Sequence, residues 1–391
     1  MANLDWRCAA AQTFVDGQIT QVDAYWQSNV LGAKIYELID QHSLWQDAFG
    51  PDGTKVKDKW RTMLAFRQVT SAGDLKRRVL GNLAGKNEFK LGSELFGILK
   101  TAVVMPLQRM HNRSSLTINF RAGGWFSQQA GFAEYTTMWD RKTTGQVLTT
   151  TADIKNPAEV RAKADRWALY GQFDDALPGK ELAGKQLAAA AGLQLPHVKK
   201  TTDPKTYKPS WDYSSSKSQP SASNPADNQV YAALNYGCRQ HGSSTRYGKS
   251  FFELSDEYKK EAIYIAMDSF TAVYAGLGGA AIPKAQRTKL YQVSAGSFGG
   301  AILLAIQSQD QGSPNTKRLL IELLSCARSP SPRADTDEEH LLIEAHIFRK
   351  VKMNSHCIKS VGVSAGECGP IEKANATKFG RQYGIPVTFI P

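Results

Sequence analysis

One short stretch, SLTINFRAGGWF at residues 115–126, interrupts a first half of the chain that otherwise has the pattern of helices. Its apolar residues Leu116, Ile118 and Phe120 alternate with polar ones, as in a strand with one buried face, and a double glycine follows them. The flanking sequence, including residues 22–49, instead repeats its apolar positions at helical spacing. We therefore expect a mainly α protein in which this stretch is one of a few short strands.

Further helix patterns occur in both halves of the chain. The first of them ends before Pro106, which we expect to stop the helix. The last begins with acidic residues and ends with basic ones, an arrangement that suits the helix dipole. The predicted helices cover residues 74–105, 156–173, 179–195, 255–283, 297–309, 315–328 and 337–353.

Residues 197–228 differ from both halves because they are rich in Ser, Pro, Lys and Thr and poor in aliphatic residues. Such a composition is typical of a linker or a long surface loop. With its interleaved tyrosines and tryptophan, it either closes over a nucleic acid strand or connects two domains. We expect two helical lobes with a basic groove between them, arranged as an N-terminal lobe over residues 1–196, the linker over 197–228, a C-terminal lobe over 229–378 and an extended terminal arm over 379–391.

The composition excludes several classes of protein. With 42% hydrophobic residues in 391, the chain is long and apolar enough for a buried core. No apolar run approaches the length that spans a bilayer, and the first residues do not resemble a signal peptide, so we expect a cytosol-like compartment and no membrane partner. Five cysteines without a C-x-x-C pair favour neither a disulfide framework nor a zinc site. We expect no metal and no cofactor.

The stretch HGSSTRYGKS at residues 241–250 lies one residue from the P-loop pattern G-x-x-x-x-G-K-[ST]. A P-loop requires glycine at the position of Ser243, and Gly242 comes one residue too early. The extra residue would move the backbone amides away from the phosphates. Since other catalytic patterns are missing as well, we expect no enzyme, and an enzyme with a degenerate nucleotide-binding loop at residues 242–250 stays as an alternative.

Positive charge is the strongest functional signal, with a net charge of +12. Between residues 76 and 121, nine basic residues oppose two acidic ones. Such clusters favour a polyanionic partner, and nearby aromatic rings suit base stacking. We expect phosphate contacts from Arg77, Arg78, Arg113, Arg121, Arg246, Lys249, Lys284 and Arg287, and stacking from Trp125 or Tyr247.

A basic, mainly helical chain with two lobes, a linker and a terminal arm resembles the nucleoproteins of negative-strand RNA viruses. This resemblance implies a protein of the virion and the host cytoplasm that encapsidates single-stranded RNA without sequence preference. It also implies self-assembly into a helical nucleocapsid and contacts with a viral phosphoprotein and polymerase. The alternative in the same class is a coat protein of a filamentous or icosahedral RNA virus.

Overall fold

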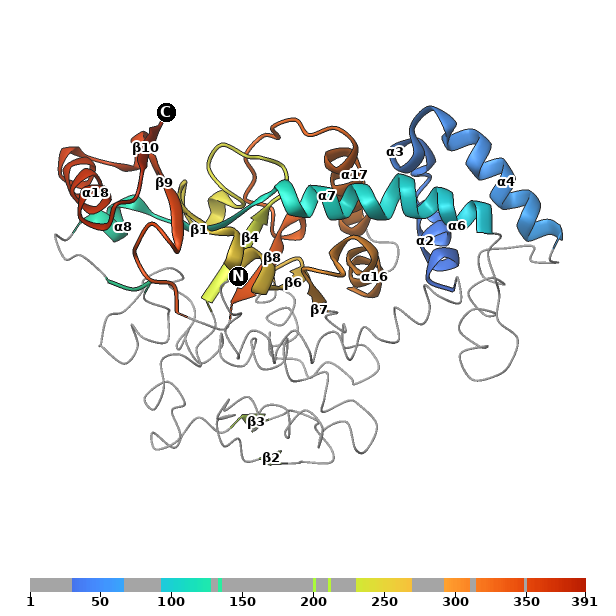
Figure 1. Cartoon of the computed structure of the whole chain (residues 1–391), viewed down its shortest axis with the longest axis horizontal. Helices are drawn as coiled ribbons and strands as arrows, with labels where there is room; N and C mark the ends of the chain where they lie inside the picture. Colours follow the sequence, from blue (N-terminus) through green and yellow to red (C-terminus); the bar gives the residue numbers. More distant parts are fainter. Residues whose placement is uncertain are drawn as a thin grey trace.

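The centre of the molecule is an eight-stranded mixed sheet with the strand order β10-β9-β5-β1-β4-β8-β6-β7 (Figure 1). The structure is a computed structural model. It describes residues 30–66, 93–127, 133–135, 200–201, 210–211, 230–268, 292–309, 314–347 and 350–391.

Neighbouring strands of this sheet pair antiparallel except for β10 and β9, which are parallel. The first strand, β1, lies between β5 and β4, so the sheet combines segments from both of the lobes expected from the sequence. The strands are β1 (Ser115–Phe120), β4 (Val230–Asn235), β5 (Ser250–Leu254), β6 (Ile263–Ala266), β7 (Gln292–Ser294), β8 (Ile343–Ile347), β9 (Ile358–Ser364) and β10 (Val387–Ile390). A separate two-stranded sheet pairs β2 (Lys200–Thr201) with β3 (Ser210–Trp211).

The expectation of a mainly α fold with few strands is therefore wrong. The strand predicted at residues 115–126 is present as β1, but two predicted helices contain strands instead: β6 within residues 255–283 and β8 within 337–353. All residues of β6 and β8 are buried, so neither strand shows the alternation that marks a half-exposed strand. The expected terminal arm contains the end of a helix followed by β10, which forms one edge of the sheet.

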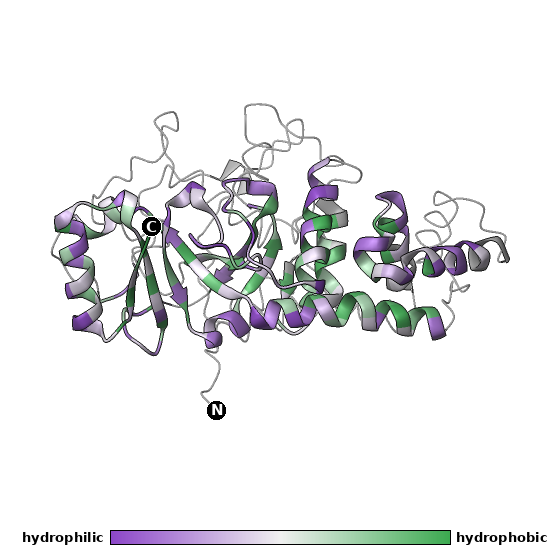
Figure 2. Ribbon diagram, turned by 90° about the horizontal axis from the view of Figure 1, so that it is seen from above, coloured by the Kyte–Doolittle hydropathy of each residue, from purple (hydrophilic) through white to green (hydrophobic). Residues whose placement is uncertain are grey.

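Helices lie at both ends of the sheet (Figure 1). At the β10 end, α18 packs against α8, and near β6 and β7 the helices α7, α16 and α17 contact one another. Hydrophobic residues concentrate on the strands, whereas α18 carries many hydrophilic ones (Figure 2). The helices are α2 (Val30–Gln41), α3 (Trp45–Phe49), α4 (Gly53–Phe66), α6 (Ser93–Leu99), α7 (Met105–Arg113), α8 (Ala122–Phe126), α14 (Asp256–Glu261), α16 (Phe298–Gln309), α17 (Pro314–Arg328) and α18 (Pro370–Tyr383).

The helices predicted at residues 297–309 and 315–328 are confirmed as α16 and α17. Those predicted at 156–173 and 179–195 lie outside the described residues. Within the described ranges, every helix is too short or too polar to cross a bilayer.

The prediction that Pro106 ends a helix is wrong. Helix α6 passes through a π-helical turn at Lys100–Val104 directly into α7, and Pro106 lies in the first turn of α7. Proline has no N–H to donate to the preceding turn and crowds the carbonyl one turn before it. A π turn changes the hydrogen-bond register at this point, so the proline is accommodated and the helix continues.

Candidate functional site

A hollow lies over the middle of the sheet. The strand register places Thr117 of β1 beside Ala233 of β4, and Ala233 beside Glu344 of β8. Residues paired in this way project from the same face of a sheet. The small methyl group of Ala233 therefore leaves room between two polar side chains, and all three residues line a pocket of about 150 Å³. An engineered cavity of roughly this volume holds a benzene ring, so one ring-sized group fits here.

One wall of the pocket comes from residues 237–249, here called the pocket loop, which contains the near-P-loop stretch. Asn119 of β1 holds this loop in place. Its Nδ2 donates to the carbonyls of His241 and Gly248 at 2.7 and 3.0 Å, and its Oδ1 accepts from the Ser243 hydroxyl at 3.2 Å. A strand of the sheet thus fixes the shape of the pocket loop.

Two glycines are required for this docking. Gly242 has φ = 82° and packs against the Asn119 side chain, and Gly248 has φ = 130° and packs against the backbone of Phe120. These backbone angles lie in the region that favours glycine. An added Cβ would also overlap Asn119 at the first position and the Phe120 carbonyl at the second. The glycines that suggested a P-loop therefore serve close packing on β1.

The amides of the pocket loop also argue against a phosphate cradle, which needs several unpaired N–H groups pointing at the ligand. In this loop the amides donate to protein atoms instead. The acceptors are Thr117 Oγ1 for Ser243, Asn119 Oδ1 for Ser244, the Thr336 carbonyl for Thr245, the Thr245 carbonyl for Gly248 and Glu367 Oε1 for Lys249, at 3.0–3.4 Å.

Residues 333–342, here called the strap, run alongside the pocket loop. Apart from one 3-10 turn at Glu339–Leu341 the strap has no regular secondary structure, yet its hydrogen bonds to the loop recur along its length. These bonds join Arg333 N to the Gly237 carbonyl (2.8 Å), Arg239 Nε to the Ala334 carbonyl (3.1 Å), His241 N to Asp335 Oδ1 (3.1 Å) and Thr245 N to the Thr336 carbonyl (3.0 Å).

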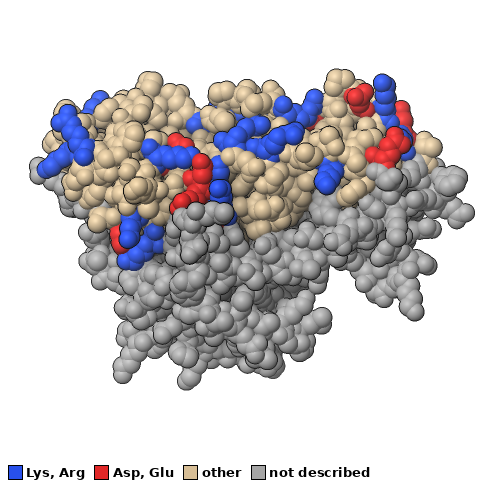
Figure 3. Space-filling view, viewed as in Figure 1, with Lys and Arg blue, Asp and Glu red and all other residues tan. Residues whose placement is uncertain are grey.

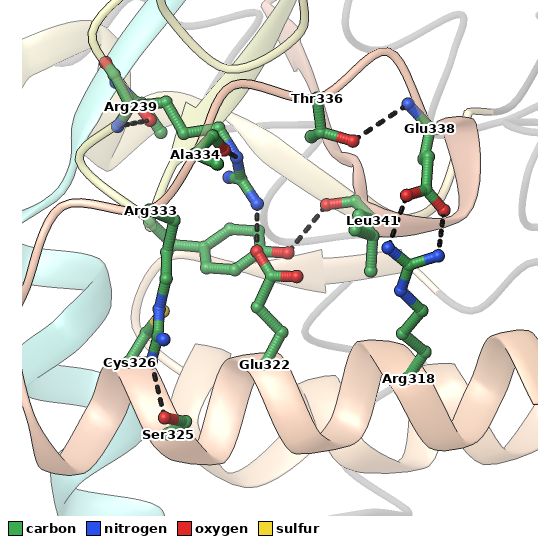
Figure 4. A network of polar contacts seen from close by, with 12 residues as sticks. Arg239, Arg318, Glu322, Ser325, Cys326, Arg333, Ala334, Thr336, Glu338 and Leu341 are labelled. Carbon is green, nitrogen blue, oxygen red and sulfur yellow. Dashed lines mark hydrogen bonds and ion pairs between the residues drawn. The ribbon is translucent and has the colours of Figure 1, made fainter.

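Helix α17 anchors the strap and the pocket loop together (Figure 4). Arg239 of the loop forms an ion pair with Glu322 of α17, and the Arg239 side chain is only 2% exposed. Arg318 of α17 forms a second ion pair with Glu338 of the strap, this one close to solvent. The network fixes the segment that leads directly into β8 and Glu344.

Asp268, which is 1% exposed, contributes one carboxylate to the pocket. It follows β6 after Met267, whose φ of 85° is unusual for a residue with a side chain. The Met267 amide donates to the Leu342 carbonyl of the strap at 2.6 Å, and the Tyr247 hydroxyl donates to the Asp268 carboxylate. Such backbone conformations persist where the surroundings hold them, and they cluster at functional sites.

Glu344 on β8 contributes the second carboxylate and is 3% exposed. Its Oε1 lies 3.1 Å from Nε2 of His346, two residues further along the same strand. A carboxylate taken out of water needs hydrogen-bond partners, because burial otherwise disfavours it by several kcal/mol. The position of Glu344 in the middle of a sheet is therefore a costly one for the fold.

Aromatic rings and hydroxyl groups complete the pocket. Tyr135, Tyr231 and Tyr247 line it, as do Ser243 and Ser244. Among the described residues, no Lys or Arg side chain lines it. The pocket therefore suits a neutral or positively charged ring with hydroxyl groups, and it disfavours an anionic group at its centre.

Of the predicted RNA contacts, Arg246, Tyr247 and Lys249 lie together on the pocket loop. Arg246 pairs with Glu339 of the strap and is about half exposed, and Lys249 is exposed. These positions leave both cations at the surface near the pocket.

The other described candidates lie apart from the pocket loop or from solvent. Arg113 donates to the Cys326 carbonyl, and Arg121 is exposed at the N-terminus of α8. Trp125 is 5% exposed and stacks on Tyr135 with ring centroids 5.6 Å apart, so its ring supports the pocket wall from within the core.

On the face in Figure 3, Lys and Arg side chains form separate groups, several of them beside Asp or Glu. The predicted contacts Arg77, Arg78, Lys284 and Arg287 lie outside the described residues.

Sequence reasoning missed Asn119, Tyr231, Asp268 and Glu344 as pocket residues. The usable signal for Glu344 was its spacing of two from His346 in the run IEAHI, which places both side chains on one face of a strand. When the same run is interpreted as a helix, the two side chains point to different faces. The four residues come from separate strands and from the turn after β6, and their proximity follows from the strand order alone.

The comparisons with known proteins add no relative. No protein-family model matches the chain, and no curated protein matches its sequence.

Proposed function

We propose that this protein is an enzyme that binds a small hydroxylated substrate in the pocket and cleaves or transfers a glycosidic bond. The observation that carries the proposal is the pair of buried carboxylates, Asp268 and Glu344, in one ring-sized pocket with tyrosines. Enzymes that break glycosidic bonds characteristically use two carboxylates, because the transition state carries positive charge on the sugar ring. A pocket of this charge stabilises such a state.

The groups in the pocket have separate tasks in this reaction. The hydroxyl and amide groups of Thr117, Asn119 and Ser243 suit the hydroxyl groups of a sugar. In the chemical step the bond from the anomeric carbon breaks, and its electron pair leaves with the departing group. Water or another acceptor then forms the new bond to that carbon and passes its proton to a carboxylate. We assign Glu344 to the face of the sugar, since Asp268 is held by Tyr247.

The charge of the pocket also ranks possible substrates. A leaving ring that carries positive charge is attracted by the carboxylates and by tyrosine faces. N-glycosides of a pyridinium ring therefore fit better than sugar phosphates bound through the phosphate.

This proposal replaces the expectation of a protein without catalytic activity. The resemblance to nucleoproteins rested on two helical lobes, whereas the described residues form a mixed sheet flanked by helices. RNA binding by the basic clusters stays a separate prediction, and its test is given below.

The test is turnover by the purified full chain with a panel of probes. The panel contains adenosine, uridine, a nucleoside diphosphate sugar, a nicotinamide dinucleotide and p-nitrophenyl β-D-ribofuranoside, with the released group measured by chromatography or absorbance. We expect Glu344→Gln to lower kcat by about 10²- to 10⁴-fold, the usual contribution of a positioned acid or base. Glu372→Gln on α18 is the matched control and should retain full activity. No turnover and no thermal stabilisation by any of the probes would refute the proposal.

A further inference from the structure

His346 has an unusual environment for a titratable side chain. It is fully buried on β8, its Nε2 lies 3.1 Å from Glu344 Oε1, and its Nδ1 has no hydrogen-bond partner within the described part of the chain. Buried polar atoms nearly always have partners, so an unpaired one calls for an explanation. Here it distinguishes the two neutral forms of the ring.

The unpaired nitrogen is better explained as an acceptor than as a donor. A buried N–H without a partner is rarer in proteins than a buried acceptor with a spare lone pair. The proton then belongs on Nε2, where it points at the Glu344 carboxylate. A doubly protonated ring would leave an N–H unpaired at Nδ1, which is costly in a buried site.

The sheet holds the imidazole ring in this orientation. In the register of the sheet, His346 lies between Tyr231 of β4 and Ile263 of β6. The Tyr231 ring meets the imidazole edge to face, with centroids 5.0 Å apart and planes at 76°. Neighbours on both sides restrict rotation of the ring, so its N–H has one direction.

We propose that His346 is a positioning residue: as the neutral Nε2–H form, it donates to Glu344 and fixes the carboxylate relative to the pocket. This inference rests on the proposed function only for the catalytic consequence. The hydrogen bond and the tautomer are claims about the folded protein and are measurable without any substrate. Tyr231, which touches both the pocket and the ring, links substrate binding to the same unit.

The first experiment is NMR of the full chain with ¹⁵N-labelled histidine near neutral pH. The chain has seven histidines, and the His346 signals are assigned from their loss in His346→Gln. We expect the Nε2–H tautomer, with the protonated nitrogen signal shifted in Glu344→Gln because the acceptor loses its charge. An Nδ1–H tautomer, or a signal that does not respond to Glu344→Gln, would overturn the proposal.

The second experiment measures turnover of whichever probe the wild-type chain cleaves. His346→Leu removes the donor, and we expect kcat to fall roughly 10- to 100-fold, the scale of one hydrogen bond to a charged group, with little change in KM. His346→Gln keeps a donor at similar reach and should recover most of the loss. Full activity in His346→Leu would refute the positioning role. If NMR shows the expected tautomer but no probe is cleaved, the proposed function fails and the hydrogen bond stands.

Discussion

The ion pair between Arg239 and Glu322 makes the sharpest prediction about stability. Arg239 joins the pocket loop to α17 through Glu322 and to the strap through the Ala334 carbonyl, and its guanidinium lies over the Tyr236 ring at 5.1 Å. The side chain is 2% exposed, so little water replaces these contacts when it is removed. The perturbation is Arg239→Met, which keeps the length of the side chain and removes its charge and donors.

The expected loss is about 4 kcal/mol in the free energy of unfolding. Breaking a buried pair from one side costs about 3–5 kcal/mol, because the other charge stays buried without its partner. An unpaired Ala334 carbonyl adds about 1 kcal/mol, and part of both losses is recovered as Glu322, whose side chain is 17% exposed, turns toward solvent.

Urea unfolding monitored by circular dichroism and tryptophan fluorescence measures this loss. The double variant Arg239→Met with Glu322→Leu should recover most of the stability, because no charge is then left unpaired. The matched control is Arg318→Met, which breaks another Arg–Glu pair between α17 and the strap. There the arginine side chain is 58% exposed, so we expect at most about 1 kcal/mol. Equal losses for the two single variants would refute the reasoning that burial sets the cost.

Three further predictions concern acid stability, backbone strain and RNA. Burial lowers the pKa of His111 from 6.5 to about 4, so the unfolded chain binds its proton first and stability should fall by about 3 kcal/mol as the pH drops through this window. His111→Phe should flatten that part of the pH dependence in urea titrations. Gly248→Ala should cost about 3 kcal/mol or more by the same assay because of its φ of 130° and the contact with β1, whereas Gly97→Ala, in open space on α6, should be neutral or stabilising. If the basic clusters bind RNA, Arg246→Ala with Lys249→Ala should weaken filter binding of a single-stranded oligonucleotide and lower its salt slope by about two, and unchanged binding would contradict that hypothesis.

Much of the candidate site was present in the sequence but in the wrong setting. Asp268 ends an apolar run and Glu344 lies inside one, and both runs had been assigned to helices. Had the runs been recognised as strands, the spacing of Glu344 and His346 would have placed them on one face. The pocket itself was not predictable, because it depends on Ala233 lying between Thr117 and Glu344 in the register.

The sequence by itself determined the elements whose pattern is local. Alternating apolar residues marked β1, and the apolar spacing marked α16 and α17, because each of these patterns depends only on near neighbours along the chain. The positive net charge is likewise a property of composition.

Only the tertiary structure decided the rest. Strands buried on both faces lose the alternation that identifies them, so β6 and β8 were distinguishable from helices only once their neighbours were known. The role of Gly242 and Gly248 changed for the same reason: the bonds from the loop amides to β1, the strap and Glu367 make the near-P-loop stretch a pocket wall. These contacts join residues far apart in the chain, and no local pattern records them.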